Sequence, residues 1–132
     1  MQSPTKGFFI DDDEDDRDFF CTAIQSIESN VDCRFAKDGS DAILQLKSDS
    51  SFIPDFIFID MNMPMMDGKE CYGAILEIDR LRNVPVYIYS TSSTPELVAE
   101  IMNMGARDFL LKPSSMGELE SLLREVLYKT AS

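Results

Sequence analysis

Short apolar runs alternate along the chain with longer segments whose apolar residues recur at helical spacing. The short runs predict strands at about residues 6–11, 31–35, 54–60, 85–90 and 108–111. The longer segments predict helices at about residues 14–28, 40–48, 68–80, 94–105 and 115–129. Strands that alternate with helices along the whole chain are typical of a parallel sheet covered by helices. The pattern therefore predicts a three-layer α/β sandwich built from βα units.

Polar side chains follow four of the predicted strands at the point where each strand ends. Asp60 ends the apolar run at residues 56–59, and the other three ends carry Asp11 and Asp12, Ser90 and Thr91, and Lys112. The carboxyl ends of parallel strands share one edge of a sheet, and open α/β sheets bind their ligands in the crevice beyond that edge. An acid cluster, a carboxylate, hydroxyls and a lysine at this edge predict a site for a divalent cation and a phosphoryl group.

The charge balance of the chain is strongly acidic. Its 132 residues hold 24 Asp and Glu against 12 Lys and Arg, a formal net charge of −12. Nucleic acids and anionic membranes are bound by basic patches, so this balance argues against both partners. No apolar stretch is long enough to span a membrane, and the N-terminus lacks the apolar core of a signal peptide. We therefore expect one cytoplasmic domain, which at this length buries roughly two-thirds of its unfolded surface.

Cysteine and histidine usage limits the chemistry that the chain can perform alone. Cys21, Cys33 and Cys71 lie in apolar periodic segments and are predicted as reduced, buried thiols without a disulfide or metal role. The chain has no His. A mechanism that needs a His as base, ligand or phosphate carrier must therefore take it from a partner.

Six consecutive acids follow the first predicted strand, and they divide into two groups. Residues 13–16 lie at a helix N-terminus, where acids suit the dipole, and are interpreted as a solvated charge run. Asp11 and Asp12 leave the strand directly, where neighbouring like charges are costly unless a cation neutralises them. An EF-hand loop is excluded, because Asp16 stands at its glycine position and Thr22 at its final glutamate position.

Carboxylate oxygens without His or Cys select a hard cation. Mg²⁺ usually takes one or two carboxylates and keeps several waters and phosphate oxygens. Asp12 and Asp60 are predicted as its ligands, with Asp11 helping directly or through a water. The last strand is predicted to be buried, and Lys112, between this strand and Pro113, is predicted as a fixed, inward-facing cation.

Two other groups of residues near this edge allow more than one interpretation. Ser90 and Thr91 either end a strand and enter a turn or direct a hydroxyl into the crevice. Four methionines follow Asp60 closely, and such residues more often pack than perform chemistry: Met61, Met63, Met65 and Met66.

The order of these features resembles the response-regulator receiver domain of two-component signalling, over about residues 6–130. Residues 1–5 are then an N-terminal tail. The motifs that carry the resemblance are Asp11-Asp12, Asp60 followed by Met63-Pro64 and Asp67-Gly68, Ser90 after 30 residues, and Lys112-Pro113 after 52 residues. The resemblance implies a flavodoxin-like (βα)5 fold with a parallel five-stranded sheet in the order 2-1-3-4-5.

The resemblance also implies a role for each matching residue. Asp60 would be the phosphoacceptor that forms an aspartyl phosphate, and Lys112 would contact the phosphate. Ser90 would be the switch hydroxyl, Phe109 the switch aromatic, and Thr91 a further phosphoryl contact. The cation, Mg²⁺ with Mn²⁺ as a substitute, would be held by Asp11, Asp12, Asp60 and the backbone carbonyl of Asn62.

Two departures from the family pattern bear on the site. Ser90 stands where Thr is commoner, which is a tolerable change. Thr91 stands where Ala or Gly is usual, so access to Asp60 is expected to be narrower. By resemblance, the Lys112–Pro113 bond is expected to be cis.

The predicted function is that of a single-domain response regulator. A histidine kinase or phosphotransfer protein would supply the phosphoryl group, and the domain would catalyse only its own phosphorylation and dephosphorylation. The chain ends after the last predicted helix, so no output domain is expected. The phosphorylated domain would signal to a protein partner, not to nucleic acid or membrane, through the face formed by roughly residues 94–129.

Two other functions are weighed against this one. A small phosphatase resembling the haloacid-dehalogenase group would use Asp11 as nucleophile and Asp13 as acid. That group needs Thr or Val where Asp15 stands, and usually a longer chain with a cap. A receiver-like scaffold that never turns over phosphate would lack a site residue, and none is missing.

Overall fold

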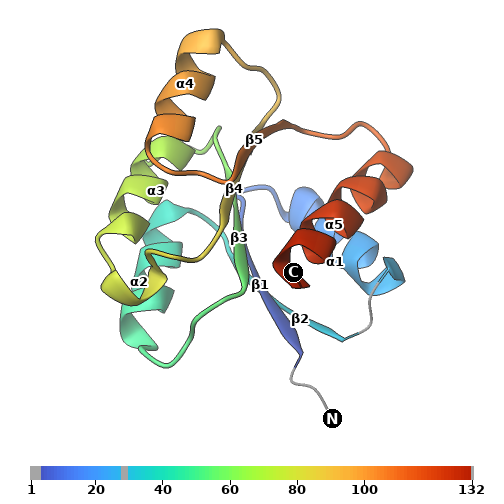
Figure 1. The fold of residues 1–132 in the computed structure, drawn as a ribbon, viewed down its shortest axis with the longest axis horizontal. Helices are drawn as coiled ribbons and strands as arrows, with labels where there is room; N and C mark the ends of the chain where they lie inside the picture. The colour runs from blue at the N-terminus through green and yellow to red at the C-terminus, as the bar shows by residue number, and fades with distance from the viewer. Residues whose placement is uncertain (1–3, 28–29, 132) are drawn as a thin grey trace.

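The computed structural model describes residues 4–27 and 30–131. Five parallel strands form one sheet in the order β2-β1-β3-β4-β5 (Figure 1). The strands are β1 (Thr5–Ile10), β2 (Val31–Ala36), β3 (Phe56–Asp60), β4 (Val86–Ser90) and β5 (Asp108–Leu111). The predicted α/β class and the strand order 2-1-3-4-5 are both confirmed.

Helices cover both faces of the sheet, as Figure 1 shows. On one face lie α1 (Glu14–Ile27) and α5 (Met116–Ala131), and on the other lie α2 (Gly39–Ser48), α3 (Gly68–Leu76) and α4 (Pro95–Asn103). Each crossover between parallel strands needs a helix, because a tight turn cannot reverse the chain within such a sheet. The five βα units thus give the expected three layers.

Each face of the sheet carries its own hydrophobic core, because successive side chains of a strand point to opposite faces. The core beneath α2, α3 and α4 is mainly aliphatic and includes Ile10, Ile57, Ile59 and Ile88. The core beneath α1 and α5 is mainly aromatic. There the Phe58 ring stacks between those of Phe9 and Tyr87, with centroid distances of 5.5 and 5.1 Å, and Phe20 packs on top.

The third predicted helix ends earlier than its sequence pattern indicates. α3 stops at Leu76, and a short 3-10 helix, η1 (Asp79–Leu81), follows it. Arg80 within η1 donates hydrogen bonds to the carbonyls of Leu46, Asp49 and Phe52, which lie at and beyond the end of α2. These long-range bonds satisfy free carbonyls of a helix terminus. The early end of α3 therefore reflects a tertiary contact, which local periodicity cannot report.

Two further expectations need correction. The last strand was interpreted as buried, but β5 is an edge strand and Leu111 is 59% exposed. Of the three cysteines, all of them free, only Cys71 is buried, whereas Cys21 and Cys33 are half-buried. Burial raises the pKa of both Cys33 and Cys71 to about 12, so the two thiols stay protonated.

Candidate functional site

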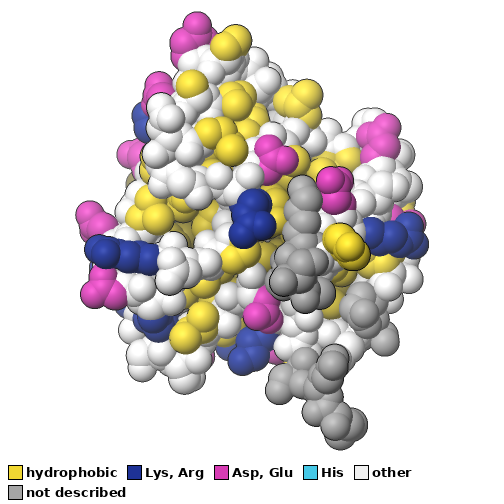
Figure 2. Space-filling view, viewed as in Figure 1, with side chains coloured by type: hydrophobic (Ala, Val, Ile, Leu, Met, Phe, Trp, Pro, Cys, Tyr) yellow, Lys and Arg dark blue, Asp and Glu magenta, His cyan; other side chains and the backbone are white. Residues whose placement is uncertain are grey.

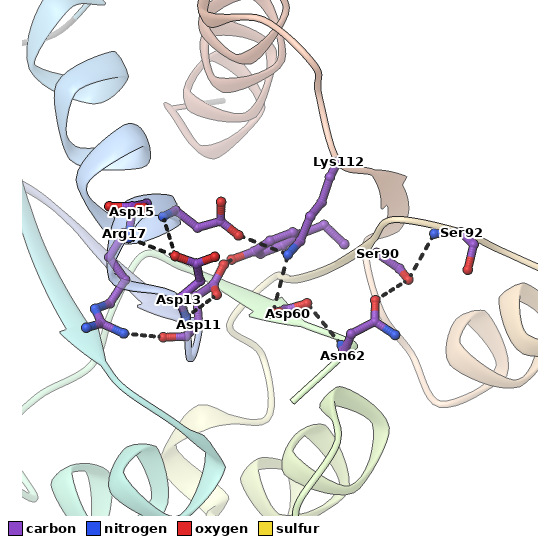
Figure 3. A network of polar contacts seen from close by, with 11 residues as sticks. Asp11, Asp13, Asp15, Arg17, Asp60, Asn62, Ser90, Ser92 and Lys112 are labelled. Atoms are coloured by element: carbon purple, nitrogen blue, oxygen red, sulfur yellow. Dashed lines mark hydrogen bonds and ion pairs between the residues drawn. The ribbon is translucent and has the colours of Figure 1, made fainter. Parts of the chain in front are cut away.

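The parallel order of the strands brings the predicted site residues to one edge of the sheet, and the alternation of side chains decides which face each one shares. Asp60 pairs with Tyr89 across β3 and β4, and Asp11 follows Ile10 at the end of β1. Asp11, Asp60 and Lys112 continue the rows of side chains that face α1 and α5. Ser90 continues the opposite row, which faces α4. The site therefore lies at the carboxyl edge of the sheet and draws side chains from both of its faces (Figure 3).

Three carboxylates meet at this edge. Asp11, Asp12 and Asp60 each offer an oxygen, and these oxygens all lie within 4.8 Å of one another. Asp11 and Asp60 are 0% and 1% exposed, whereas Asp12 is exposed. Among residues 4–27 and 30–131 this is the only acid cluster with the geometry of a metal site. A set made of carboxylate oxygens alone fits a hard divalent cation such as Mg²⁺.

Hydrogen bonds hold the two buried carboxylates in place. Asp11 accepts from the backbone N–H of Asp13 through Oδ1 at 2.9 Å and from the Tyr89 hydroxyl through Oδ2 at 2.5 Å. Asp60 Oδ1 accepts from the backbone N–H of Asn62 at 3.0 Å. Asp11 is thus held at both carboxylate oxygens and Asp60 at Oδ1, and each oxygen keeps a further lone pair for a ligand.

Burial raises the pKa of both carboxyl groups. The pKa of Asp11 rises from 3.8 to about 7, chiefly through lost solvation, with a smaller contribution from the charge on Asp60. The pKa of Asp60 is also raised by burial, against the opposing effects of the Asn62 N–H and Lys112. A cation between these carboxylates would offset the repulsion between their negative charges.

Lys112 supplies the positive charge at this edge. Its Nζ lies 3.4 Å from Asp60 Oδ2 and 3.0 Å from Asp16 Oδ2, in agreement with the predicted inward orientation. Its backbone N–H donates to the carbonyl of Ser90 at 2.8 Å, which fixes where the side chain begins. Burial lowers the pKa of Lys112, but the hydrogen bond to Asp16 and the charges on Asp11 and Asp60 outweigh it. The net shift is upward, and the ammonium stays charged.

The Lys112–Pro113 bond was expected to be cis, and that expectation is wrong. No peptide bond in the part of the chain that the structure describes is cis. The backbone N–H of Lys112 extends the pairing of β5 with β4.

Ser90 and its neighbours occupy the other side of Asp60. The Ser90 hydroxyl donates to the side-chain Oδ1 of Asn62 at 2.8 Å and accepts from the backbone N–H of Ser92 at 3.3 Å (Figure 3). Thr91 is exposed at the start of the loop after β4. Phe109 on β5 is half-buried and packs against the core beneath α4.

The loop between β3 and α3 passes close to the backbone of Asp60. A Cβ on Gly68 would come within 2.7 Å of both the carbonyl oxygen of Asp60 and the Cα of Met61, so only glycine fits. Asp67 then begins α3 with a capping box, in which its side chain and that of Glu70 each accept from the other's backbone N–H. The Asp67-Gly68 pair of the sequence motif thus fixes the loop that follows Asp60.

Three residues of this region were missed or assigned differently by the sequence analysis. Asp13 caps α1, because its Oδ1 accepts from the backbone N–H of Asp15 at 2.9 Å. Asp16 forms an ion pair with Lys112 and therefore does not belong to a solvated run of acidic residues. Tyr89 was read only as a strand residue. Its position in the sequence could have indicated a role in the site. Tyr89 directly precedes Ser90, and its side chain lies on the same face of the sheet as that of Asp60.

The model of the response regulator receiver domain family matches residues 8–124 of this chain. The chain belongs to that family, and it is the receiver domain of a response regulator. It is 30% identical over 120 residues to the transcriptional regulatory protein PrrA of Mycobacterium tuberculosis. That match covers 90% of this chain and 49% of PrrA, so the chain spans about half the length of this relative.

Two solved structures illustrate the similarity. The chemotaxis protein CheY4 of Vibrio cholerae is 26% identical, with a TM-score of 0.79 over 93% of this chain and 98% of that one. A chain of the CheX–CheY–BeF3–Mg²⁺ complex of Borrelia burgdorferi is 25% identical, with a TM-score of 0.79 over 94% of this chain and 90% of that one. Both similarities extend over nearly the whole sheet and its helices.

The family assignment bears on the other predictions. Receiver domains are signal transducers that bind Mg²⁺ or Mn²⁺ at an acidic pocket and interact with histidine kinases or phosphotransfer proteins. The phosphatase alternative is not supported, and the side chain of Asp13, its proposed acid, caps a helix. Among the described helices, none is long and apolar enough to cross a membrane.

Proposed function

We propose that Asp60 accepts a phosphoryl group from a phosphohistidine of a histidine kinase or phosphotransfer protein. One observation carries this proposal: a buried carboxylate stands between two further acids and a lysine whose Nζ is 3.4 Å away. Family membership supports the same reaction. The chain itself has no His, so the donor imidazole belongs to the partner.

In the proposed reaction, a carboxylate oxygen of Asp60 attacks the phosphorus atom. A P–O bond forms, the P–N bond to the donor imidazole breaks, and the imidazole leaves with the electron pair. The Asn62 N–H holds Oδ1 of Asp60 during the attack, and Lys112 neutralises charge on the transferred group.

Asp11, Asp12 and Asp60 would hold the divalent cation, Mg²⁺ or Mn²⁺, together with the backbone carbonyl of Asn62. When bound, the cation neutralises the phosphoryl oxygens and so lowers the barrier to attack by an anion. The domain performs this chemistry only on its own Asp60, and slow hydrolysis later releases inorganic phosphate and restores the free carboxylate. It therefore acts as a switch and has no separate substrate.

The switch would begin at Ser90. Its hydroxyl now donates to Asn62 Oδ1, and a phosphoryl oxygen on Asp60 would be a competing, charged acceptor. Ser90 would exchange one acceptor for the other, with Thr91 as a further phosphoryl contact. Phe109, packed beneath α4, would respond by changing rotamer.

The output surface would be the face formed by α4, β5 and α5. Each of these elements exposes a large apolar side chain: Met102 is 40%, Leu111 59% and Tyr128 76% exposed. Figure 2 shows hydrophobic side chains exposed over α4 on this face. Both states of the switch should be populated before phosphorylation, and the phosphoryl group would then only shift their ratio. The partner would be a protein, since the net charge of −12 disfavours nucleic acid.

Labelling with a small phosphodonor tests the acceptor site. With acetyl phosphate and Mg²⁺ we expect acid-stable, hydroxylamine-sensitive label on the wild type and none on Asp60→Asn. The matched control is Asp55→Asn, which removes an exposed carboxylate just before the opposite end of β3. Equal labelling of wild type and Asp60→Asn would reject the assignment, and turnover of added phosphoesters would favour a phosphatase.

NMR shift mapping with beryllofluoride and Mg²⁺ tests the switch. We expect perturbations to extend from the loops around Asp60 to Phe109 and to residues 94–105. Perturbations confined to the loops around Asp60 would reject the proposed route from Ser90 to the output surface.

A further inference from the structure

Tyr89 contacts both kinds of charge in the site. Its hydroxyl donates to Asp11 Oδ2 at 2.5 Å, and the Nζ of Lys112 lies 5.3 Å from its ring centroid. The side chain is 2% exposed. Its backbone carbonyl also accepts from the N–H of Met61, and its pairing partner across the sheet is Asp60.

The ring of Tyr89 is fixed by the aromatic core below it. Its centroid lies 5.1 Å from that of Phe20 and 6.0 Å from that of Phe58, in tilted contacts. Aromatic pairs at these distances are favourable beyond the area that they bury. The hydroxyl is therefore presented to Asp11 from a rigid support and not from a mobile loop.

The hydroxyl limits the orientations that Asp11 can adopt. Oδ1 of Asp11 is held by the N–H of Asp13, and Oδ2 by Tyr89, so rotation of the carboxylate breaks at least one hydrogen bond. In this orientation the oxygens of Asp11 also lie within reach of those of Asp12 and Asp60. Partners that orient metal ligands in this way affect metal affinity, although they do not touch the metal.

We propose that Tyr89 is a positioning residue of the receiver site. Its hydroxyl holds Asp11 in the orientation that binds the divalent cation, and its ring supports the ammonium of Lys112. This inference rests on the proposed function, because it assumes that the cluster of Asp11, Asp12 and Asp60 binds Mg²⁺.

Tyr89→Phe removes the hydroxyl and keeps the ring. We expect the dissociation constant for Mg²⁺ to rise roughly tenfold, the usual effect of losing a partner that orients a ligand. The phosphorylation rate at saturating Mg²⁺ should stay within about twofold of wild type, because the ring beneath Lys112 remains. A loss of general packing would not separate these two quantities in this way.

Tyr87→Phe is the matched control. It removes a hydroxyl from another buried tyrosine two residues earlier in β4, on the same face of the sheet, paired with Phe58 and not with Asp60. Its Mg²⁺ affinity and its phosphorylation rate should match those of the wild type. Thermal melting of both variants without Mg²⁺ shows whether each is folded.

The experiment is a Mg²⁺ titration followed by heteronuclear NMR or calorimetry, with acetyl phosphate labelling run in parallel on the full chain. Wild-type affinity in Tyr89→Phe, or an equal loss in both variants, would overturn the role of the hydroxyl. A reduced rate at saturating Mg²⁺ with unchanged affinity would overturn it as well. If the wild type itself neither binds Mg²⁺ nor is labelled, the proposed function fails, and this inference fails with it.

Discussion

Asp11→Asn should stabilise the protein in the absence of metal. Asp11 is fully buried beside Asp60, and its pKa is raised to about 7 from 3.8. The folded state therefore binds this proton more tightly than the unfolded state does. The cost of ionising Asp11 is absent near pH 4, grows as the pH rises, and is complete above about pH 7.

The size of the effect follows from the shift. At about 1.4 kcal/mol per pKa unit, a shift of about three units sets an upper limit of about 4 kcal/mol. Solvent screening and relaxation of the site reduce this limit, so we expect about 2 kcal/mol of stabilisation near pH 8, or roughly 5–10 °C in melting temperature. Asn keeps an oxygen for the N–H of Asp13, and its amide can donate to the Tyr89 oxygen.

The assay is urea unfolding in the presence of a chelator, near pH 5 and near pH 8. The gain in Asp11→Asn should be largest near pH 8 and less than half as large near pH 5. Asp12→Asn should change stability little, because Asp12 is exposed. The sequence assigned the cost of neighbouring like charges to Asp11 and Asp12 together, and this pattern would assign it to Asp11. The reasoning would be refuted if Asp11→Asn raised the free energy of unfolding equally at both pH values, or did not raise it near pH 8.

Three further outcomes are expected. Gly68→Ala should destabilise the protein by about 1–3 kcal/mol, because its methyl group meets backbone atoms at 2.7 Å. Gly117→Ala in α5 should stabilise the protein by about 0.5–1 kcal/mol, since nothing lies within 4 Å of the added methyl group. Urea unfolding measures both changes. Asp16→Asn should change stability by less than about 1 kcal/mol but tighten beryllofluoride binding several-fold, as seen by NMR titration, because Lys112 loses a competing carboxylate. In a Mg²⁺ titration, Asp12→Ala should lose affinity and Asp15→Ala should not, and equal losses would contradict the cluster geometry.

Much of this site could be predicted because its residues lie where strands end. Asp60 and Lys112 each follow a short apolar run, and the alternation of a strand fixes which face its last side chain shares. The parallel order of the sheet then brings these ends together without any knowledge of the loops. The strand order itself entered through the family resemblance, since spacing alone does not determine it.

Other features depend on contacts that local pattern does not contain. In the sequence, Asp16 is one of several acidic residues at the start of a helix. Only the position of Lys112 across the crevice shows that the two form an ion pair. The early end of α3 depends on Arg80 reaching α2. The cis bond before Pro113 was carried over from the family resemblance and did not follow from this chain's own residues, and no peptide bond among the described residues is cis.

The two separate cores give the two faces of the sheet different roles in the proposed function. Tyr89 and Ser90 are neighbours in β4, yet one faces the acids and the aromatic core and the other faces the aliphatic core beneath α4. Substitutions in the aromatic layer should therefore adjust how readily the phosphoryl group is taken up and lost. Those in the aliphatic layer should adjust how strongly that event is transmitted. On the proposed function, the timing of a signal and its strength would thus respond to substitutions in different layers of one small sheet.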